Sequence, residues 1–547
     1  MSSVADFLVD RLHSAGIKHV FGIAGSYILD FCDKLSRNQH ITLVNTTDEA
    51  HAGFAANAYA RVNGSGCVCV TYNVGALKVA NAVACAYAER SPMVVISGAP
   101  GLREREEGVM LHHTVRNFNC QKEIFDRITC FAACLDSPSM AGFVIDQALD
   151  MMKYHKRPVY LELPRDMCLK PLTYSVYELG TPKTAKSNSE SLKVCMEEVK
   201  EMLAAAKNPV VMAGVELARY GLGERLLRFL EHNRIPVVTE LLSKSVVPET
   251  HPLFAGLYCG GASRAEVQER VENSDCLIML GMVLTDVTLN FSANRFKPQN
   301  MIFCNVEEMR VRHHYYRQVQ FLDFCDQLFR MESPSKSPSL PSPVRTPPPP
   351  ASNNKITTAT LFERLNHFIN QDTSYAVLAD VGDGLFGAGE LTIPKAGNFI
   401  SPASYTSMGF AIPGALGVQL ANPSLRPLVI AGDGSFQMTL GEISTIIDRK
   451  LNPIIVILNN RGYATERLLR DGPFNDIRNW KYHAVAEVFG GGSGFMVNTE
   501  AELEQALNQA KSSSQVCIIN VQLDKKDVTA SSRRLMENLS KKQSVKG

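Results

Sequence analysis

Two apolar segments of this sequence each end in residues that could hold an ion. The run that begins at Arg426 stops at Gly-Asp-Gly-Ser, which places the carboxylate of Asp433 between two glycines. A second run, residues 454–458, stops at Asn459-Asn460-Arg461-Gly462. Because the carboxyl ends of parallel strands share one edge of a sheet, where ligands bind, we expect Asp433 and Asn460 to face the same crevice.

The oxygen atoms at these strand ends suit Mg²⁺ or Ca²⁺. The Asp433 carboxylate, the Asn460 amide oxygen and the main-chain carbonyl of Gly462 give three hard ligands, and Mg²⁺ usually completes its octahedron with water and phosphate oxygens. A diphosphate is therefore the natural missing ligand. Gly434 lets the backbone approach such an anion, and Ser435 and the start of the following helix supply donors and a positive dipole. An isolated Gly-Asp-Gly also fits a plain tight turn, but the asparagine pair favours the ion site.

Other ligand-binding motifs do not occur in the sequence. Gln437 occupies the position of the third glycine of a dinucleotide-binding fingerprint, and there is no GxxxxGK[ST] phosphate loop. No C-x-x-C pair occurs, which disfavours structural zinc. The 14 cysteines lie mostly inside apolar runs such as CVCV at Cys67 and Cys69, and they predict buried free thiols.

The residues between the two apolar runs predict which elements connect the two strands of the site. Thr439 and Glu442 are placed as a capping box, and a helical stripe of apolar residues follows, so we predict a helix that begins there and ends near Lys450. Asn452-Pro453 then turns the chain into the next strand. The whole segment predicts a β-α-β unit.

Short apolar strands alternate with helical patterns along the chain, which predicts an α/β fold with parallel sheets flanked by helices. At 547 residues the chain is too long for one core, and we expect three domains, at residues 1–180, 190–331 and 356–528. Residues 332–355, rich in proline and serine, predict an extended mobile linker. Residues 529–547 predict a flexible tail.

Charge and composition limit the partners. Lysine plus arginine (56) and aspartate plus glutamate (55) nearly cancel, so no global field would draw nucleic acid or an anionic membrane. Ser3 and Asp6 are placed as the capping box of an amphipathic N-terminal helix, and no apolar run reaches the roughly 18 residues of a membrane span. We expect a cytoplasmic protein whose partner is a small molecule.

The Gly-Asp-Gly-Ser segment and the asparagine pair, whose second member lies 27 residues beyond Asp433, resemble the signature of thiamine diphosphate-dependent enzymes. The resemblance covers nearly the whole chain. The chain is similar to 2-oxo acid decarboxylases that act on pyruvate, on indolepyruvate and, with the strongest resemblance, on phenylpyruvate. The segments that carry it are FGIAGS, DEAHAGFAANAYAR, YAERSPMVVISGAPG, LHHT, ADVGDGLFG, SMGFAIPGALG and FNDIRNW. The resemblance implies a thiamine diphosphate-binding fold with pyrimidine-binding, middle and diphosphate-binding domains, and thiamine diphosphate and Mg²⁺ as cofactors.

The resemblance also implies which residues meet the ring end of the cofactor. Glu49 matches the glutamate that hydrogen-bonds the aminopyrimidine ring, Met408 matches the apolar residue that wedges between the two rings, and the carbonyl of Thr406 matches the acceptor for the exocyclic amine. Taken alone, Glu49 fits a first-turn carboxylate behind Thr46 or Thr47, and Met408 fits core packing. The matching segments favour the cofactor roles.

Further residues are implied near the reaction centre. His112 and His113 match the histidine pair that handles the substrate carboxylate and protons, and Glu466 matches the glutamate that lies over the reactive carbon. Taken alone, the histidines fit surface positions, and Glu466 fits an i,i+4 pair with Arg470. Ser26 departs from the pattern, because pyruvate and indolepyruvate enzymes carry aspartate there, whereas benzoylformate decarboxylases carry serine. We expect decarboxylation to be less affected than release of the aldehyde.

Two more departures concern the diphosphate and the substrate pocket. Asp383 and Gly384 stand where pyruvate enzymes have a Thr-Ser pair that helps to hold the diphosphate, and we expect this segment to contact it through the backbone. Ala464 and Thr465 are smaller than the usual residues before the active-site glutamate and predict a pocket for a side chain larger than methyl. The resemblance further implies a homodimer with active sites between subunits, with a dimer of dimers as an alternative.

Together these expectations favour non-oxidative decarboxylation of an aromatic or branched-chain 2-oxo acid to an aldehyde and CO₂. A thiamine diphosphate-dependent carboligase stays open because of Ser26. A catalytically silent cofactor-binding scaffold is disfavoured, because Glu49, His112, His113 and Glu466 are all present.

Overall fold

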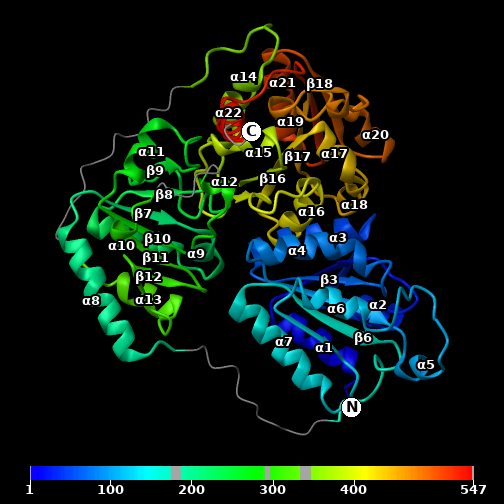
Figure 1. Cartoon of the computed structure of the whole chain (residues 1–547). Helices are drawn as coiled ribbons and strands as arrows, with labels where there is room; N and C mark the ends of the chain where they lie inside the picture. Colours follow the sequence, from blue (N-terminus) through cyan, green and yellow to red (C-terminus); the bar gives the residue numbers. More distant parts are fainter. Residues whose placement is uncertain (1, 174–185, 290–295, 333–346, 545–547) are drawn as a thin grey trace.

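Three β-sheets covered by helices form the framework of the chain in a computed structural model (Figure 1). The structure describes residues 2–173, 186–289, 296–332 and 347–544. Buried apolar residues pack on both faces of the sheets. The predicted α/β class with parallel sheets flanked by helices is confirmed.

The first sheet is parallel throughout. In spatial order its strands are β2 (Thr42–Asn45), β1 (His19–Gly22), β3 (Gly66–Val70), β4 (Met93–Ala99), β6 (Val159–Pro164) and β5 (Phe131–Cys134). The accompanying helices are α1 (Val4–Ser14), α2 (Leu29–Arg37), α3 (Glu49–Asn63), α4 (Ala76–Ala88), α5 (Leu102–Glu106), α6 (Cys120–Asp126) and α7 (Ala141–His155). Helix α1 begins with the predicted capping box, in which the Asp6 N–H donates to Ser3 Oγ at 3.2 Å and the Ser3 N–H donates to the Asp6 carboxylate at 3.1 Å.

The second sheet is parallel except at one edge, where β12 pairs antiparallel with both of its neighbours. In spatial order its strands are β13 (His314–Tyr315), β12 (Met309–Val311), β11 (Met301–Cys304), β10 (Cys276–Leu280), β7 (Pro209–Ala213), β8 (Val237–Thr239) and β9 (Phe254–Leu257). Its helices are α8 (Ser189–Ala205), α9 (Val215–Arg219), α10 (Gly223–Asn233), α11 (Ala265–Glu272), α12 (Asp286–Leu289), the 3₁₀ turn η1 (Pro298–Asn300) and α13 (Phe321–Leu328).

The third sheet is again parallel throughout. In spatial order its strands are β15 (Phe399–Ile400), β14 (Tyr375–Ala379), β16 (Arg426–Gly432), β17 (Ile454–Asn459), β19 (Cys517–Gln522) and β18 (Ser493–Val497). Its helices are α14 (Thr358–Ile369), α15 (Asp383–Gly389), α16 (Ala411–Ala421), α17 (Asp433–Thr439), α18 (Glu442–Asp448), α19 (Ala464–Leu469), η2 (Pro473–Asn475), η3 (Tyr482–Ala484), α20 (Val485–Val488), α21 (Glu500–Ser512) and α22 (Ala530–Ser544).

Helices α3 and α16 join the first and third sheets through one continuous apolar core. Figure 1 shows α3 lying against α16. The two backbones come so close that a Cβ on Gly417 would lie 2.1 Å from the Ala55 carbonyl oxygen. The first and third domains of the same chain therefore pack closely on each other through these two helices.

The predicted helix after the Gly-Asp-Gly segment differs from the observed one. Instead of a capping box at Thr439 and Glu442, α17 begins at Asp433 and ends at Thr439, and α18 begins at Glu442 without a side-chain cap. The Glu442 carboxylate is engaged elsewhere, because it accepts hydrogen bonds from Thr47 Oγ1 at 2.9 Å and His51 Nδ1 at 3.0 Å in the first domain. The predicted β-α-β connection between β16 and β17 is present.

The prediction of a flexible tail at residues 529–547 is wrong over the residues that the structure describes. Residues 530–544 form helix α22, which packs against α15 and α19. The side chains of Thr529, Ser532 and Leu535 are buried there. An apolar residue and two hydroxyl groups with buried partners therefore fix a segment whose composition predicted disorder.

Much of the predicted linker 332–355 and the predicted boundary at residue 180 lie outside the described residues. Residues 347–354 run along the third domain, where Ser352 Oγ donates to the Glu500 carboxylate at 3.2 Å.

All 14 cysteines are free, as predicted. Within the described ranges, no helix has the length and apolarity needed to span a membrane.

Candidate functional site

The ends of β16 and β17 bring together the two predicted ion-binding side chains. The strands are hydrogen-bonded neighbours, so the residues that follow them emerge at one sheet edge. The buried Asp433 carboxylate accepts hydrogen bonds from the main-chain N–H of Arg461 at 2.6 Å and of Gly434 at 2.9 Å. Asp433 therefore lies directly beside the segment that contains Asn460.

The chemistry of this edge fits a divalent cation. Asn460 Oδ1 is buried and accepts no hydrogen bond from any described residue. Burial raises the pKa of Asp433 to about 7. A desolvated carboxylate beside an unpartnered amide oxygen is unfavourable unless a cation compensates for it. At Gly462 the backbone has no room for a side chain, because a Cβ there would lie 2.1 Å from the Asn475 carbonyl oxygen.

The predicted diphosphate loop is the first turn of α17. Ser435 is buried, and its hydroxyl has no hydrogen-bond partner among the described residues. Gly434 is packed against an aromatic ring, since a Cβ there would lie 2.6 Å from Cε1 of Tyr463. The loop therefore keeps a buried hydroxyl available for a ligand.

Asp380 is a buried carboxylate that the sequence did not single out. It follows β14 and accepts hydrogen bonds from the N–H groups of Val381 at 2.9 Å, Gly409 at 3.0 Å and Ala411 at 3.0 Å. It therefore ties the end of β14 to the segment that begins α16. The available signal was a charged residue at the end of the apolar run YAVLAD.

Thr406 and Met408 lie in the loop that Asp380 holds. Thr406 has a φ of 56°, a left-handed conformation that is uncommon for a β-branched residue, and it is exposed. Met408 is half-buried rather than part of the apolar core. The loop also reaches the first domain, where Asn81 Nδ2 donates to Ser407 Oγ at 2.8 Å.

Asp383 and Gly384 open α15 at the same sheet edge. The Asp383 carboxylate does not face a ligand, because it accepts hydrogen bonds from Thr529 Oγ1 and Ser532 Oγ, both at 2.6 Å. The carboxylate is therefore engaged within the chain, and contact of this segment with an anion through its backbone stays a prediction.

Glu466 lies in the first turn of α19 and is exposed. No ion pair joins it to Arg470 within the described part of the chain, where only the Arg470 N–H donates to the Glu466 carbonyl oxygen, at 2.8 Å. Ala464 and Thr465, immediately before it, are buried. Its carboxylate is thus free of the i,i+4 pairing that offered a structural explanation.

Glu49 is the first residue of α3, and the helix is capped by Asp48 rather than by Thr46 or Thr47. Lys78 of α4 donates to both carboxylates and lies 2.7 Å from the Glu49 oxygen. Glu49 therefore has a cationic partner inside the first domain.

Ser26, His112 and His113 gather at the carboxyl edge of the first sheet. Ser26 Oγ lies 3.1 Å from His112 Nε2, and the two imidazole rings are 4.7 Å apart. Tyr27, which the sequence did not single out, contacts the other ring nitrogen of His112, at 3.1 Å. Burial and the neighbouring His112 lower the pKa of His113.

The predicted site residues therefore form two groups, one on each of the first and third sheets. The first-domain group contains Ser26, Glu49, His112 and His113, and the third-domain group contains Asp383, Gly384, Thr406, Met408, Asp433, Gly434, Ser435, Asn460, Gly462 and Glu466. Among the described residues, no hydrogen bond or ion pair joins the two groups.

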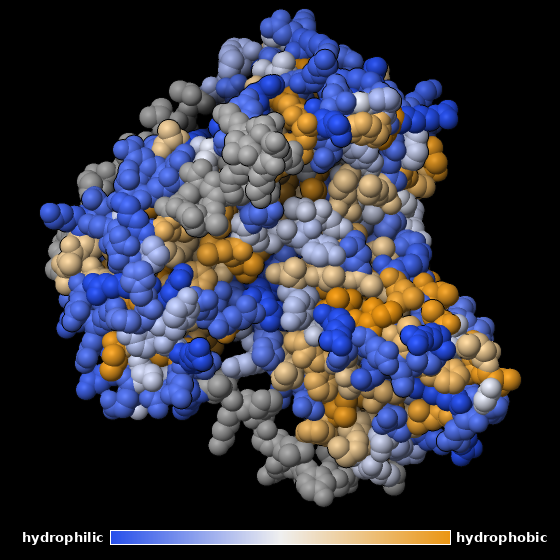
Figure 2. All heavy atoms as spheres, viewed as in Figure 1, coloured by the Kyte–Doolittle hydropathy of each residue, from blue (hydrophilic) through white to orange (hydrophobic). Residues whose placement is uncertain are grey.

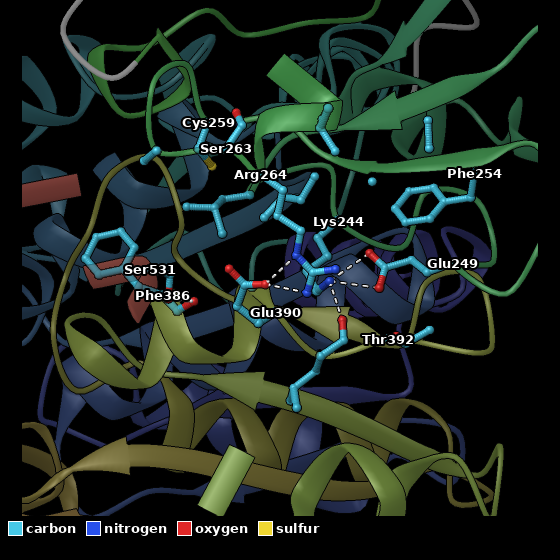
Figure 3. A pocket seen from close by; sticks show the side chains of 18 of the residues that line it. Lys244, Glu249, Phe254, Cys259, Ser263, Arg264, Phe386, Glu390, Thr392 and Ser531 are labelled. Atoms are coloured by element: carbon cyan, nitrogen blue, oxygen red, sulfur yellow. Dashed lines mark hydrogen bonds and ion pairs between the residues drawn. The ribbon is translucent and has the colours of Figure 1, made fainter. Parts of the chain in front are cut away.

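A separate cavity lies between the second and third domains (Figure 3). Its charged residues pair with one another: Lys244 donates to the Glu249 carboxylate and to the Leu391 carbonyl oxygen, and Arg264 pairs with Glu390. None of the predicted site residues lines it.

Comparison with known proteins agrees with this geometry. Residues 2–123 match the thiamine pyrophosphate enzyme N-terminal TPP binding domain, residues 196–330 the central domain and residues 380–521 the C-terminal TPP binding domain. A probable pyruvate decarboxylase from Schizosaccharomyces pombe is 31% identical over 96% of this chain and 94% of its own length. The chain belongs to the thiamine diphosphate-dependent 2-oxo acid decarboxylase family.

Other relatives in the family differ in the substrate that they are named for. An indole-3-pyruvate decarboxylase from Azospirillum brasilense is 32% identical over 93% of this chain and 92% of its own length. An alpha-keto-acid decarboxylase from Mycolicibacterium paratuberculosis is 30% identical over 93% and 91%. Both groups of predicted site residues fall inside the family's two TPP-binding domains.

Proposed function

We propose that the protein converts a 2-oxo acid, preferably an aromatic or branched-chain one, to an aldehyde and CO₂, using thiamine diphosphate and Mg²⁺. The observation that carries this proposal is the pairing of Asp433 with the unpartnered Asn460 amide oxygen at adjacent strand ends. In this arrangement Asp433, Asn460 and the Gly462 carbonyl would hold Mg²⁺, and the N–H group and the unpartnered hydroxyl of Ser435 would meet the diphosphate, which the absence of a side chain at Gly434 lets approach.

When bound, thiamine diphosphate supplies the carbon nucleophile and the electron sink of the reaction. The chain positions the cofactor and handles protons. Glu49 hydrogen-bonds the pyrimidine ring, Met408 packs between the rings and Thr406 offers its carbonyl oxygen. Asp380 supports this loop by accepting the N–H groups of Gly409 and Ala411.

Ser26, His112, His113 and Glu466 are the proposed proton-handling groups. The low pKa of His113 keeps it neutral near pH 7, where it can accept a proton. The absence of a carboxylate at position 26 leaves the hydroxyl and the imidazoles to move protons there.

The substrate preference is proposed from the start of α19. Ala464 and Thr465 are small and buried beside Glu466, so their size leaves space for a substrate side chain larger than methyl. The named relatives act on pyruvate, on indole-3-pyruvate and on alpha-keto acids, which is compatible with this range.

We further propose that two copies of the chain share each active site. The first-domain group and the third-domain group make no polar contact with each other within the described residues, and both are needed for the reaction. Exposed apolar side chains lie near the histidine pair, including Val109, Met110 and Val115. Figure 2 shows hydrophobic patches on the first domain in a surface that is otherwise largely hydrophilic.

A substrate screen tests the proposal. Purified protein with thiamine diphosphate and Mg²⁺ is assayed for aldehyde from pyruvate, branched-chain, phenyl and indolyl 2-oxo acids. We expect the larger substrates to give the higher kcat/KM. A clear preference for pyruvate would contradict the proposed pocket, and no aldehyde from any substrate would contradict the proposed reaction.

A carboligase is the alternative that Ser26 favours, because a site slow to release aldehyde can react with a second carbonyl compound. Incubation with one 2-oxo acid and an added aldehyde separates the two functions. We expect free aldehyde to exceed acyloin; the reverse ratio would establish the carboligase.

A further inference from the structure

Tyr27, Ser26 and His112 form a chain of hydrogen bonds at the carboxyl edge of the first sheet. The Tyr27 hydroxyl lies 3.1 Å from His112 Nδ1 and 3.2 Å from the carbonyl oxygen of the same residue. His112 Nε2 lies 3.1 Å from Ser26 Oγ. Both ring nitrogens of the histidine thus have a hydroxyl partner.

Only one placement of protons makes all three hydrogen bonds at once when His112 is neutral. The carbonyl oxygen can only accept, so Tyr27 donates its single proton to it. The Tyr27 oxygen then accepts from Nδ1–H. A neutral imidazole with its proton on Nδ1 has a bare Nε2, and the Ser26 hydroxyl donates to that nitrogen.

The surroundings hold this arrangement in place. Tyr27 is 1% exposed, its ring stacks on His112 at 4.6 Å, and Tyr72 packs edge-on against it at 5.6 Å. Burial raises the pKa of Tyr27, so the phenol keeps its proton in the neutral range. The next residue is fixed as well, because Asn73 Nδ2 donates to the His113 carbonyl oxygen at 2.7 Å.

The titratable and charged groups around His112 are few. His113 lies edge-on at 4.7 Å, and Arg165 lies over the Tyr27 ring at 5.2 Å. The charges of Glu162 and Arg105 influence the pKa of Tyr72, which packs against Tyr27. Among the described residues, no carboxylate makes a hydrogen bond or ion pair with His112 itself.

We propose that Tyr27 is a positioning residue that fixes the tautomer of His112, and that Ser26 and His112 form a neutral proton relay. In one transfer, the reacting group gives a proton to Ser26 Oγ, the Ser26 O–H bond breaks, and a new N–H bond forms at His112 Nε2. His112 becomes an imidazolium whose Nδ1–H still donates to Tyr27. The identity of the reacting group in this inference rests on the proposed function, whereas the tautomer of His112 does not depend on it.

Kinetics of Tyr27→Phe, Ser26→Ala and the double variant test the relay. We expect Tyr27→Phe to lower kcat about tenfold, as for one lost hydrogen bond, and to shift the acidic limb of the pH profile. Thiamine diphosphate affinity, followed by fluorescence of the only tryptophan, Trp480, should not change. Because both residues act through His112, Ser26→Ala should cost much less in the Tyr27→Phe background than in the wild-type background.

Tyr72→Phe is the matched control, since it also removes a buried hydroxyl next to Tyr27, and within the described residues the Tyr72 hydroxyl makes no hydrogen bond to His112. It should keep wild-type kcat and pH profile. If the costs of Tyr27→Phe and Ser26→Ala multiply, or if Tyr27→Phe matches the wild type at every pH, the relay is wrong.

A measurement without turnover separates this inference from the proposed function. In protein labelled with ¹⁵N-histidine, we expect the NMR signals of His112 to show a protonated Nδ1, and Tyr27→Phe to remove that signature. A wild-type His112 protonated on Nε2 would overturn the inference whatever the activity. Loss of all decarboxylation in the wild type, with the Nδ1 signature intact, would overturn only the proposed reaction.

Discussion

Two buried aspartates of the third domain, Asp380 and Asp433, have main-chain N–H groups as their main donors. Burial raises the pKa of Asp380 to about 6 and that of Asp433 to about 7. They differ in their surroundings, because Asp380 accepts three main-chain N–H groups, two of them from the segment that contains Gly409 and Ala411, whereas Asp433 lies beside the unpartnered oxygen of Asn460. We therefore expect Asp380 to fix the conformation of the loop that contains Thr406 and Met408, and Asp433 to bind a cation.

Asp433→Asn removes the charge from the proposed Mg²⁺ site. We expect thiamine diphosphate affinity in the presence of Mg²⁺ to fall by about a hundredfold or more, since the amide that replaces the carboxylate carries no charge to balance the cation. Titration calorimetry measures this. Asp448→Asn, an exposed carboxylate on α18 that is 79% accessible, should bind like the wild type. Undiminished binding by Asp433→Asn would rule out this ion site.

Asp380→Asn tests the loop support and has a defined pH dependence. An amide turns a donor toward one of the three N–H groups, so we expect a loss of about 1–3 kcal/mol in stability. The folded wild type holds the Asp380 proton up to about pH 6, whereas the unfolded chain releases it near 3.8. Proton binding at Asp380 therefore stabilises the folded wild type fully below about pH 4, and this contribution is lost as the pH rises to about 6.

The stability gap between Asp380→Asn and the wild type should therefore be largest near pH 4 and narrow up to about pH 6. Urea unfolding of both proteins at several pH values measures it. A gap that is constant with pH would contradict the raised pKa.

At the scale of elements, apolar runs with polar ends located most strands that carry the site. β16 and β17 are continuous apolar stretches, so the positions of Asp433 and Asn460 followed from local pattern alone. Asp380, Tyr27 and Glu442 were missed, because their partners come from loops or domains distant in sequence. The helix after Asp433 was placed too late because Glu442 looked like a capping residue but binds the first domain.

Helix α22 was missed for a similar reason, since its sequence is mostly polar and charged and only tertiary contacts fix it. Ser532→Ala tests this contact. It removes one of the two hydroxyl donors to the buried Asp383 carboxylate, so we expect a stability loss of about 1–3 kcal/mol. Arg533→Ala, an exposed neighbour on the same helix, should change the thermal midpoint little. Equal midpoints for Ser532→Ala and the wild type would mean that the helix does not support α15.

At the scale of the whole molecule, the first and third domains are held together by packing of α3 on α16 and by buried carboxylates, which include Glu89, an acceptor for the N–H groups of Ser404 and Tyr405, and Glu442. Glu442 is 0% exposed and accepts the Thr47 N–H at 3.2 Å in addition to the contacts with the Thr47 hydroxyl and His51. Thr47 stands two residues before Glu49. The third domain therefore bears directly on the position of the proposed pyrimidine-binding residue.

Glu442→Ala should weaken this junction. It leaves a buried N–H and an imidazole without their acceptor, so we expect the free energy of unfolding, measured with urea, to fall by about 1–3 kcal/mol, together with a lower kcat. Glu487→Ala, an exposed carboxylate on α20, is the control. If kcat is unchanged while stability falls, Glu442 is structural only and does not orient the start of α3.

The contact between α22 and α15 has a consequence for limited proteolysis. The hydroxyl groups that donate to the buried Asp383 carboxylate belong to Thr529 and Ser532, so trimming of residues 529–544 would strip this carboxylate of both donors. Such a cut should therefore loosen the start of α15, at the carboxyl edge of the third sheet, although it breaks the chain far from that edge in sequence.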